Sequence, residues 1–284
     1  MPKAVIDTLD VAIRTAGSPV CVGLDPVLES LPQEVRSRHH EPLAAVAEFT
    51  HGVLRSVAGI VPAVKFQSAC FERYGSRGYA LLEESAAEAV RLGLVVIWDA
   101  KRGDIGTTSA HYAASAKRLG SHFVTVNGYL GRSGLTPFLD EGLGVFVLVR
   151  TSNPDSDAIQ GVRLADGRTV AEMLADHVCS LGDSAIGECG LSAVGAVVGA
   201  TKAADAKSLR ERMPNQVFLI PGYGAQGGTA ADLKNMLRPD GRGILVTASR
   251  SVIYPKAGTG DWKSDIAQAA KTLKSEVAAM IGEP

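Results

Sequence analysis

The chain has 284 residues, of which 46% are hydrophobic and 21% charged, and its formal net charge is −1. This composition is typical of a globular protein with a substantial core, and the near-zero charge argues against a nucleic-acid partner. No apolar run approaches the ~20 residues needed to cross a bilayer, so no membrane partner is expected. The N-terminus is acidic and amphipathic, which is not the pattern of a signal peptide.

The cysteines and histidines argue against redox and metal motifs. Cys21, Cys70, Cys179 and Cys189 include no CxxC pair, and Cys21 lies in an apolar strand-like run, where cysteine usually acts as a small buried hydrophobe. We therefore expect reduced thiols and a cytoplasmic protein. The six histidines show no metal-ligand spacing, so we expect neither a metal nor a cofactor.

Strand-like and helix-like segments alternate along the chain. A helix is predicted at about 3–16, where it would cap the bottom of the fold. Eight apolar runs follow, at 20–24, 60–66, 94–98, 123–126, 145–149, 193–198, 217–220 and 244–247. They lack polar alternation, which indicates strands buried on both faces, as in a parallel sheet. Amphipathic helices are predicted at 42–57, 77–92, 107–119, 133–141, 169–186, 203–212, 229–237 and 262–281.

Eight strand–helix units predict an α/β protein with one domain over residues 1–284, a closed (β/α)8 TIM barrel. The alternative is an open doubly wound sheet, but no GxGxxG follows the first strand to favour it. Residues 150–170 interrupt the alternation of strand-like and helix-like segments, because they are polar and rich in turn formers. They predict a long loop after the fifth strand, and such loops lie on the active face of barrels and can act as lids.

Three charges, Asp99, Lys101 and Asp104, follow the third predicted strand at close spacing. Side chains alternate along a strand, so Asp99 and Lys101 are expected to share a face. Burying charge is costly unless it is paired, and such sites often carry chemistry. The alternative is a structural ion pair at the barrel mouth.

Polar residues also lie at the ends of most of the other predicted strands or just after them, and barrel enzymes carry their sites at these carboxyl ends. They include Asp25, Lys65, Asn127, Thr151, Ser152, the glycine-rich 221–228 and Arg250. Glycines let backbone N–H groups approach an anion and Arg250 adds a cation, so the last two loops predict a phosphate grip. The alternatives are a tight turn for the glycines, a turn start for Asp25, and loop capping for Asn127 and Ser152.

The stretch Asp99-x-Lys101-x-x-Asp104-Ile105-x-x-Thr108 resembles the hallmark of the orotidine 5'-phosphate decarboxylase family. Further matches along the barrel are Asp25, Lys65, Ser152, Gln226 and Arg250. The long 150–170 connection resembles the longer-chain subgroup of that family. A sugar-phosphate decarboxylase branch shares the hallmark, but Ser152 and the 224–227 loop favour a pyrimidine nucleotide. Ser249 departs from the family pattern, in which many members have Gly before the phosphate-binding arginine.

The resemblance implies decarboxylation of orotidine 5'-phosphate to UMP, the last step of de novo pyrimidine nucleotide synthesis. Lys101 would be the general acid that protonates C6, and Asp99 would repel the substrate carboxylate. Asp104 would be supplied to the neighbouring subunit's site in a homodimer with shared active sites, completing an alternating array with Lys65, Asp99 and Lys101.

The resemblance also implies how the substrate is held. Lys65, Asp25 and Thr108 would hold ribose hydroxyls, with Thr108 coming from the partner subunit. Ser152 would bind the pyrimidine, Gln226 would bridge ring and phosphate, and Arg250 would bind phosphate. Asn127 and Gly224 are counted among the substrate-binding residues.

Three other functions fit parts of the pattern. One is a sugar-phosphate decarboxylase or related barrel enzyme that uses a divalent metal. Another is a Schiff-base aldolase with Lys65 or Lys101 as nucleophile, although lysines ringed by carboxylates stay protonated and attack poorly. The third is a non-catalytic protein that binds a phosphorylated ligand, which would leave the acid–base–acid cluster unexplained.

Overall fold

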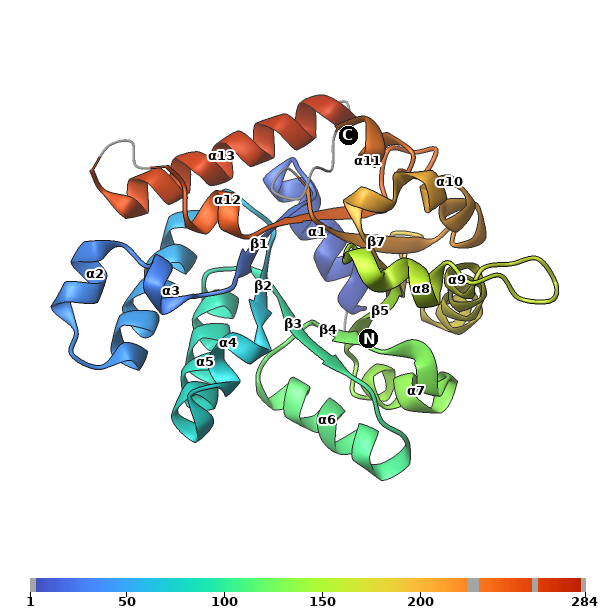
Figure 1. Cartoon of the computed structure of the whole chain (residues 1–284), viewed down its shortest axis with the longest axis horizontal. Helices are drawn as coiled ribbons and strands as arrows, with labels where there is room; N and C mark the ends of the chain where they lie inside the picture. The colour runs from blue at the N-terminus through green and yellow to red at the C-terminus, as the bar shows by residue number, and fades with distance from the viewer. Residues whose placement is uncertain (1–3, 224–229, 257–259, 282–284) are drawn as a thin grey trace.

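Eight parallel strands close into a barrel in sequence order in the computed structural model, which describes residues 4–223, 230–256 and 260–281 (Figure 1). The strands are β1 (Val20–Leu24), β2 (Ala63–Gln67), β3 (Val95–Arg102), β4 (Phe123–Val126), β5 (Gly144–Arg150), β6 (Ser192–Val198), β7 (Gln216–Pro221) and β8 (Ile244–Ala248). The pairing of β1 with β8 closes the ring. The predicted TIM barrel is therefore confirmed.

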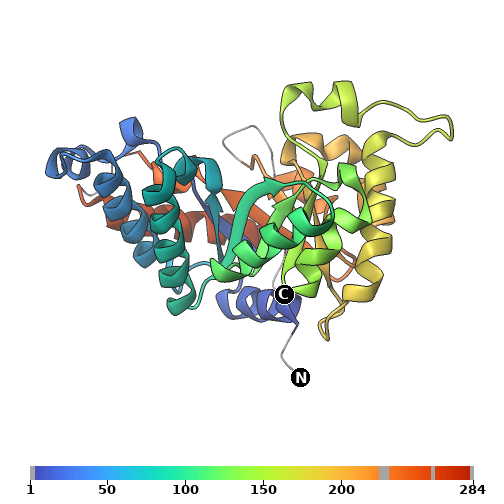
Figure 2. The same cartoon turned by 90° about the horizontal axis from the view of Figure 1, so that it is seen from below.

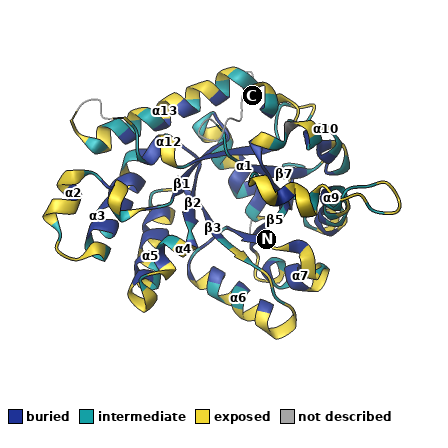
Figure 3. Ribbon diagram, in the orientation of Figure 1, coloured by how far each residue is buried: buried dark blue, intermediate teal, exposed yellow. Residues whose placement is uncertain are grey.

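Helices surround the barrel and bury their inner faces against it (Figures 1 and 3). The longer ones are α1 (Val5–Ala16), α3 (Pro42–Val57), α5 (Gly75–Arg91), α6 (Gly106–Arg118), α7 (Arg132–Asp140), α9 (Val170–Gly182), α10 (Ala203–Arg212) and α13 (Trp262–Ile281). The short ones are α2 (Gln33–Arg38), α4 (Ser68–Glu72), α8 (Asp157–Gln160), α11 (Ala230–Lys234) and α12 (Arg250–Ile253). Single 3₁₀ turns are η1 (Leu28–Ser30), η2 (Gly128–Leu130), η3 (Pro154–Ser156), η4 (Asp183–Ala185) and η5 (Ala200–Lys202). None of the helices described is long and apolar enough to cross a membrane.

The apolar residues form two cores, one between barrel and helices and one inside the barrel. Phe123 and Phe146 pack in the inner core with ring centroids 5.1 Å apart. Ile6 and Leu9 of α1 are fully buried in the same cluster. Helix α1 therefore closes the amino-terminal end of the barrel, as Figure 2 shows beneath the strands. The carboxyl ends of the strands are left to form a site.

Several boundaries differ from those expected. The second strand begins at Ala63 rather than at 60, and β3 continues beyond residue 98 to Arg102, so Asp99 and Lys101 lie within it. The predicted helix at 169–186 ends as α9 at Gly182, and η4 follows. The short helices α2, α4 and α12 were not predicted, since segments of four to six residues carry little periodicity.

The connection after β5 is more ordered than the predicted loop at 150–170. It contains η3 and α8, and an isolated bridge joins Arg163 to Thr169. The buried guanidinium of Arg150 explains this order. Its Nε donates to Asp205 at 2.6 Å, its Nη1 donates to Ser156 at 3.2 Å, and its Nη2 donates to Asp157. A charge removed from water in this way needs such partners, and they fold the segment back onto the barrel.

Candidate active site

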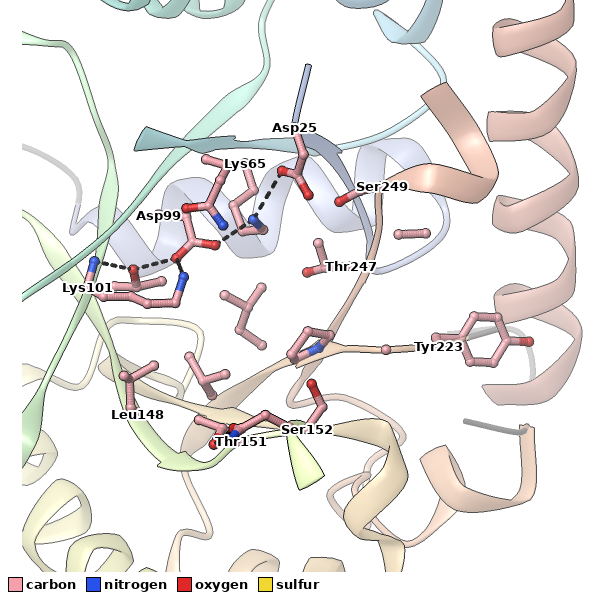
Figure 4. Close-up of a pocket in the computed structure, with 18 of the residues that line it drawn as sticks. Asp25, Lys65, Asp99, Lys101, Leu148, Thr151, Ser152, Tyr223, Thr247 and Ser249 are labelled. Atoms are coloured by element: carbon pink, nitrogen blue, oxygen red, sulfur yellow. Dashed lines mark hydrogen bonds and ion pairs between the residues drawn. The ribbon is translucent and has the colours of Figure 1, made fainter. Parts of the chain in front are cut away.

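A cavity of about 540 Å³ opens at the carboxyl ends of the strands (Figure 4). This size lies within the usual range for small-molecule sites. Residues from all the strands or from the loops after them line it, including Asp25, Lys65, Asp99, Lys101, Thr125, Leu148, Ser152, Val197, Leu219, Tyr223, Thr247 and Arg250. The cavity thus brings together most of the strand-end residues singled out in the sequence.

Two lysines share one carboxylate in the wall of this cavity. Lys65 donates from Nζ to Asp99 Oδ2 at 2.6 Å, and Lys101 donates from Nζ to Asp99 Oδ1 at 2.6 Å. The Lys65 ammonium also lies 3.8 Å from Asp25 Oδ1. Figure 4 shows these four side chains in one row across β1, β2 and β3. Lys65 and Asp99 are buried, whereas the Lys101 side chain is 48% exposed and reaches into the cavity.

This arrangement keeps the buried pair charged. Burial by itself would raise the pKa of Asp99, but the ammonium groups of Lys65 and Lys101 lower it to about 2. Burial would likewise lower the pKa of Lys65, but the carboxylates of Asp99 and Asp25 raise it above its usual value. A permanent negative charge and two cations therefore sit beside the space where a ligand would bind.

Thr125 on β4 is a site residue that the sequence reading missed. Its Oγ1 donates to Asp99 Oδ1 at 2.8 Å and accepts from the Lys101 backbone N–H at 3.0 Å. One signal was available, because Thr125 is the single polar residue in the apolar run 123–126. A polar side chain on the inner face of a buried strand needs a partner, and here the partner is the charged pair.

The β5 connection supplies the wall across the cavity. Ser152, Thr151, Asn153 and Gln160 all line it. The Thr151 backbone N–H donates to Gln160 Oε1 at 2.8 Å, and Gln160 Nε2 donates to Thr151 Oγ1 at 2.8 Å. Gln160 is a second site residue that the sequence reading missed, and it had no sequence signal, because its contact depends on how the connection folds back. It ties α8 to Thr151, the residue between the end of β5 and Ser152.

The end of the cavity near β8 carries Arg250, which begins α12, together with Ser249, Gly222 and Tyr223. Gly224 and Gln226, both predicted to contact the substrate, lie outside the described residues. Asp25 Oδ1 is buried and, within the described part of the chain, takes part in no hydrogen bond. Such an acceptor is suited to a hydroxyl group of a ligand.

Three predicted site residues do not line the cavity of this chain. Asp104 accepts from the neighbouring Ile105 N–H at 2.9 Å, and Thr108 is exposed on α6. Asn127 Oδ1 accepts from the Tyr129 N–H and so caps η2, which is the structural alternative considered for it. Its predicted contact with a substrate gains no support from this position.

Exposed apolar side chains lie next to Asp104 in the chain and on the neighbouring turn η2. Ile105 is 55% exposed, Tyr129 87% and Leu130 44%. The segment 104–105 and the turn η2 both lie near Gly134. A Cβ on Gly134 would lie 2.7 Å from the Asp104 carbonyl oxygen and 3.8 Å from Leu130 Cβ. We call Ile105, Tyr129 and Leu130 the α6–η2 patch. Clustered exposed apolar groups of this kind often mark protein interfaces.

Other features of the described residues bear on the alternatives. They contain no group of three or more His, Cys, Asp or Glu side chains arranged to hold a metal ion. Lys65, as a Schiff-base nucleophile, would have to lose a proton that Asp99 and Asp25 help it retain. The closed barrel, the cavity at its carboxyl ends and the paired lysines together define a (β/α)8-barrel enzyme site.

Comparison with known proteins identifies the family. Residues 18–257 match the orotidine 5'-phosphate decarboxylase / HUMPS family. An orotidine 5'-phosphate decarboxylase of Rhodopirellula baltica is 41% identical over 263 residues, which cover 87% of each chain. That of Deinococcus radiodurans is 42% identical over 245 residues and 84% of each chain. The solved structure of Leishmania donovani OMP decarboxylase has a TM-score of 0.79 at 33% identity, covering 98% of this chain and 99% of that one. The chain therefore belongs to the orotidine 5'-phosphate decarboxylase family, as its hallmark motif predicted.

Proposed function

We propose that this chain decarboxylates orotidine 5'-phosphate to UMP, the last step of de novo pyrimidine nucleotide synthesis. The observation that carries the proposal is the hydrogen-bonded array of Lys65, Asp99 and Lys101 in the wall of a cavity that also contains Arg250. The names of the relatives reported above support the same reaction.

The array suits a reaction that leaves negative charge on carbon. When the bond between C6 and the carboxylate breaks, CO2 leaves and the electron pair stays on C6, where the ring offers no attached electron sink. Lys101 supplies a nearby cation and then transfers a proton from Nζ to C6. Asp99, ionised beside the substrate carboxylate, repels it and favours its loss.

One charge pair is not enough to account for such catalysis. Two unit charges ~4 Å apart interact by about 4 kcal/mol at an effective dielectric constant near 20. Enzymes lower barriers by up to ~23 kcal/mol, so binding energy from the rest of the substrate must contribute. Arg250 is the cation suited to grip the phosphate group, away from the reacting carbon.

The remaining groups that line the cavity suit the rest of the nucleotide. Asp25 Oδ1, which takes part in no hydrogen bond within the described structure, and Lys65 would hold ribose hydroxyls. Ser152, tied in place through Thr151 and Gln160, would bind the pyrimidine edge. The substrate contacts of Gly224 and Gln226 stay predictions, because both residues lie outside the described part of the chain.

We further propose a homodimer with shared sites, in which Asp104 and Thr108 complete the cavity of the partner subunit. Both residues lie away from the cavity of their own chain, and the exposed α6–η2 patch beside them supplies apolar surface for a second copy. A cytoplasmic location remains a prediction from the spacing of the cysteines.

The decisive experiment incubates the purified chain with orotidine 5'-phosphate in the presence of a chelator and follows ultraviolet absorbance. We expect the spectrum of the substrate to change to that of UMP. No change would reject the proposal, and decarboxylation of a sugar phosphate that a chelator abolishes would favour the metal-dependent alternative instead.

A further inference from the structure

Lys101 has an unusual backbone conformation. Its φ is 47°, and among the described residues it is the only non-glycine with positive φ. An L-amino acid is disfavoured in this left-handed region and stays there only when its surroundings hold it. Contacts with the rest of the fold, rather than the backbone preference of lysine, must therefore hold Lys101 in this conformation. Its ammonium group is the one that faces the proposed reacting carbon.

The conformation coincides with an irregularity between β3 and β4. Trp98 pairs with Val124, and the next pair joins Arg102 to Val126. β3 thus advances four residues, from 98 to 102, while β4 advances two, from 124 to 126. The extra residues on β3 include Asp99 and Lys101, and Thr125 lies opposite them. A bulge of this kind redirects side chains at the end of a strand.

The Thr125 hydroxyl occupies this bulge and makes two bonds there. It accepts from the Lys101 N–H at 3.0 Å, so a side-chain oxygen replaces the regular backbone acceptor of a strand. It donates its own proton to Asp99 Oδ1 at 2.8 Å, the oxygen that also accepts from Lys101 Nζ at 2.6 Å. Backbone, carboxylate and ammonium are thereby joined through one buried hydroxyl.

We propose that Thr125 is a positioning residue that holds Lys101 in its left-handed conformation and directs the ammonium group toward the substrate. This inference rests on the proposed function and adds to it a residue that does not itself react. The hydroxyl can serve both bonds at once because it has one donor and two acceptor positions. Serine at this position keeps the hydroxyl group that makes both bonds. Valine keeps the branched shape of the threonine side chain but has no hydroxyl group.

The test compares Thr125→Val and Thr125→Ser with Thr50→Val. Thr50 is a fully buried threonine on α3 whose hydroxyl has no hydrogen-bond partner in the described structure. We expect Thr125→Val to lower kcat by roughly 100-fold, because small displacements of a catalytic group have effects of that size. KM should change little, since the groups proposed to hold ribose and phosphate lie on other strands. Thr125→Ser should recover most of the rate, and Thr50→Val should match the unmodified enzyme.

Hydrogen exchange provides a readout that does not depend on activity. The Lys101 amide loses its acceptor in Thr125→Val, so it should exchange faster there than in Thr125→Ser or Thr50→Val. Thr125→Ala, which brings no added bulk beside Asp99, should behave like Thr125→Val and serves if that variant does not fold.

The outcomes separate the two proposals. A kcat for Thr125→Val or Thr125→Ala equal to that of Thr50→Val, or unchanged exchange at Lys101, overturns the positioning role. An unmodified enzyme that leaves orotidine 5'-phosphate intact rejects the proposed function instead, and the exchange comparison still decides whether Thr125 holds Lys101.

Discussion

Lys65 Nζ and Asp99 Oδ2 lie 2.6 Å apart across adjacent strands, and the two side chains are only 7% and 9% exposed. Removing one member of such a pair leaves the other buried with less compensation. We expect Lys65→Met to lower the free energy of unfolding by about 3–5 kcal/mol, measured with urea at pH 7. Arg77→Met is a suitable control, because Arg77 and its partner Glu41 are 69% and 48% exposed, and its loss should cost little. Equal effects of the two substitutions would contradict this account.

Stability at acid pH should depend on the same pair. The pKa of Asp99 falls from 3.8 to about 2 in the folded chain, so its contribution is present above pH 4 and is lost as the pH drops from about 4 to 2. Without Lys65 the pKa of Asp99 rises, so this contribution is smaller and its loss is complete at a higher pH. Unfolding free energies of the unmodified chain and Lys65→Met, measured from pH 2 to 6, should therefore converge at the acid end. Parallel curves would show that Lys65 does not set this pKa.

Arg250 should matter for the rate although it lies away from the reacting carbon. We expect Arg250→Ala to lower kcat/KM roughly 100-fold, which corresponds to about 3 kcal/mol of lost transition-state stabilisation, because the variant loses a charge-assisted contact with phosphate. Orotidine, which lacks the phosphate group, should react poorly with the unmodified enzyme and no more poorly with Arg250→Ala. Full additivity of the two losses would mean that Arg250 does not act through phosphate.

Mixed dimers test the shared site. Lys101→Ala and Asp104→Asn should each be nearly inactive alone. If Asp104 serves the partner, a dimer that combines the two variants contains one intact site, and an equal random mixture should recover about a quarter of full activity. The steady-state rate after mixing and re-annealing measures this recovery. Self-contained sites would give none.

The α6–η2 patch makes a separate prediction about assembly. Ile105→Asp puts a charge on this patch and should shift the protein toward monomer, as measured by its molar mass in solution. Specific activity should fall with it. A variant that stays dimeric would place the interface elsewhere on the surface.

Arg150 should control the order of the connection after β5. Its side chain is 7% exposed and contacts Asp157, Ser156 and Asp205. We expect Arg150→Met to destabilise the chain by about 1–2 kcal/mol and to speed proteolytic cleavage between 151 and 169. Arg168→Met is the control, because Arg168 lies in the same connection but is 36% exposed, and its loss should cost little. Equal cleavage of both variants would argue against this role of Arg150.

The barrel could be predicted from hydrophobic runs because a strand buried on both faces has few alternative interpretations. The charged residues at the strand ends could be found because barrel geometry brings those ends together. The reason given for the proximity of Asp99 and Lys101 was incomplete, since simple alternation is interrupted at Lys101, whose φ is 47°. Their contact depends on the bulge opposite Thr125, which is a tertiary feature without a local signal. The contact of Gln160 with Thr151 could not be predicted from the sequence for the same reason.

The closure of the barrel through β1 and β8 has a consequence for synthesis of the chain. Val22 pairs with Ala248, and the Ser249 side chain packs so closely on Gly23 that a Cβ at that glycine would lie 1.9 Å from Ser249 Oγ. Asp25 and Arg250 therefore share one cavity only after the eighth strand has been translated. Until then the nascent chain exposes two unpaired sheet edges, which are prone to non-native association. Assembly of this site is thus a late event in biosynthesis, and β1 must stay unpaired on one side until β8 is available.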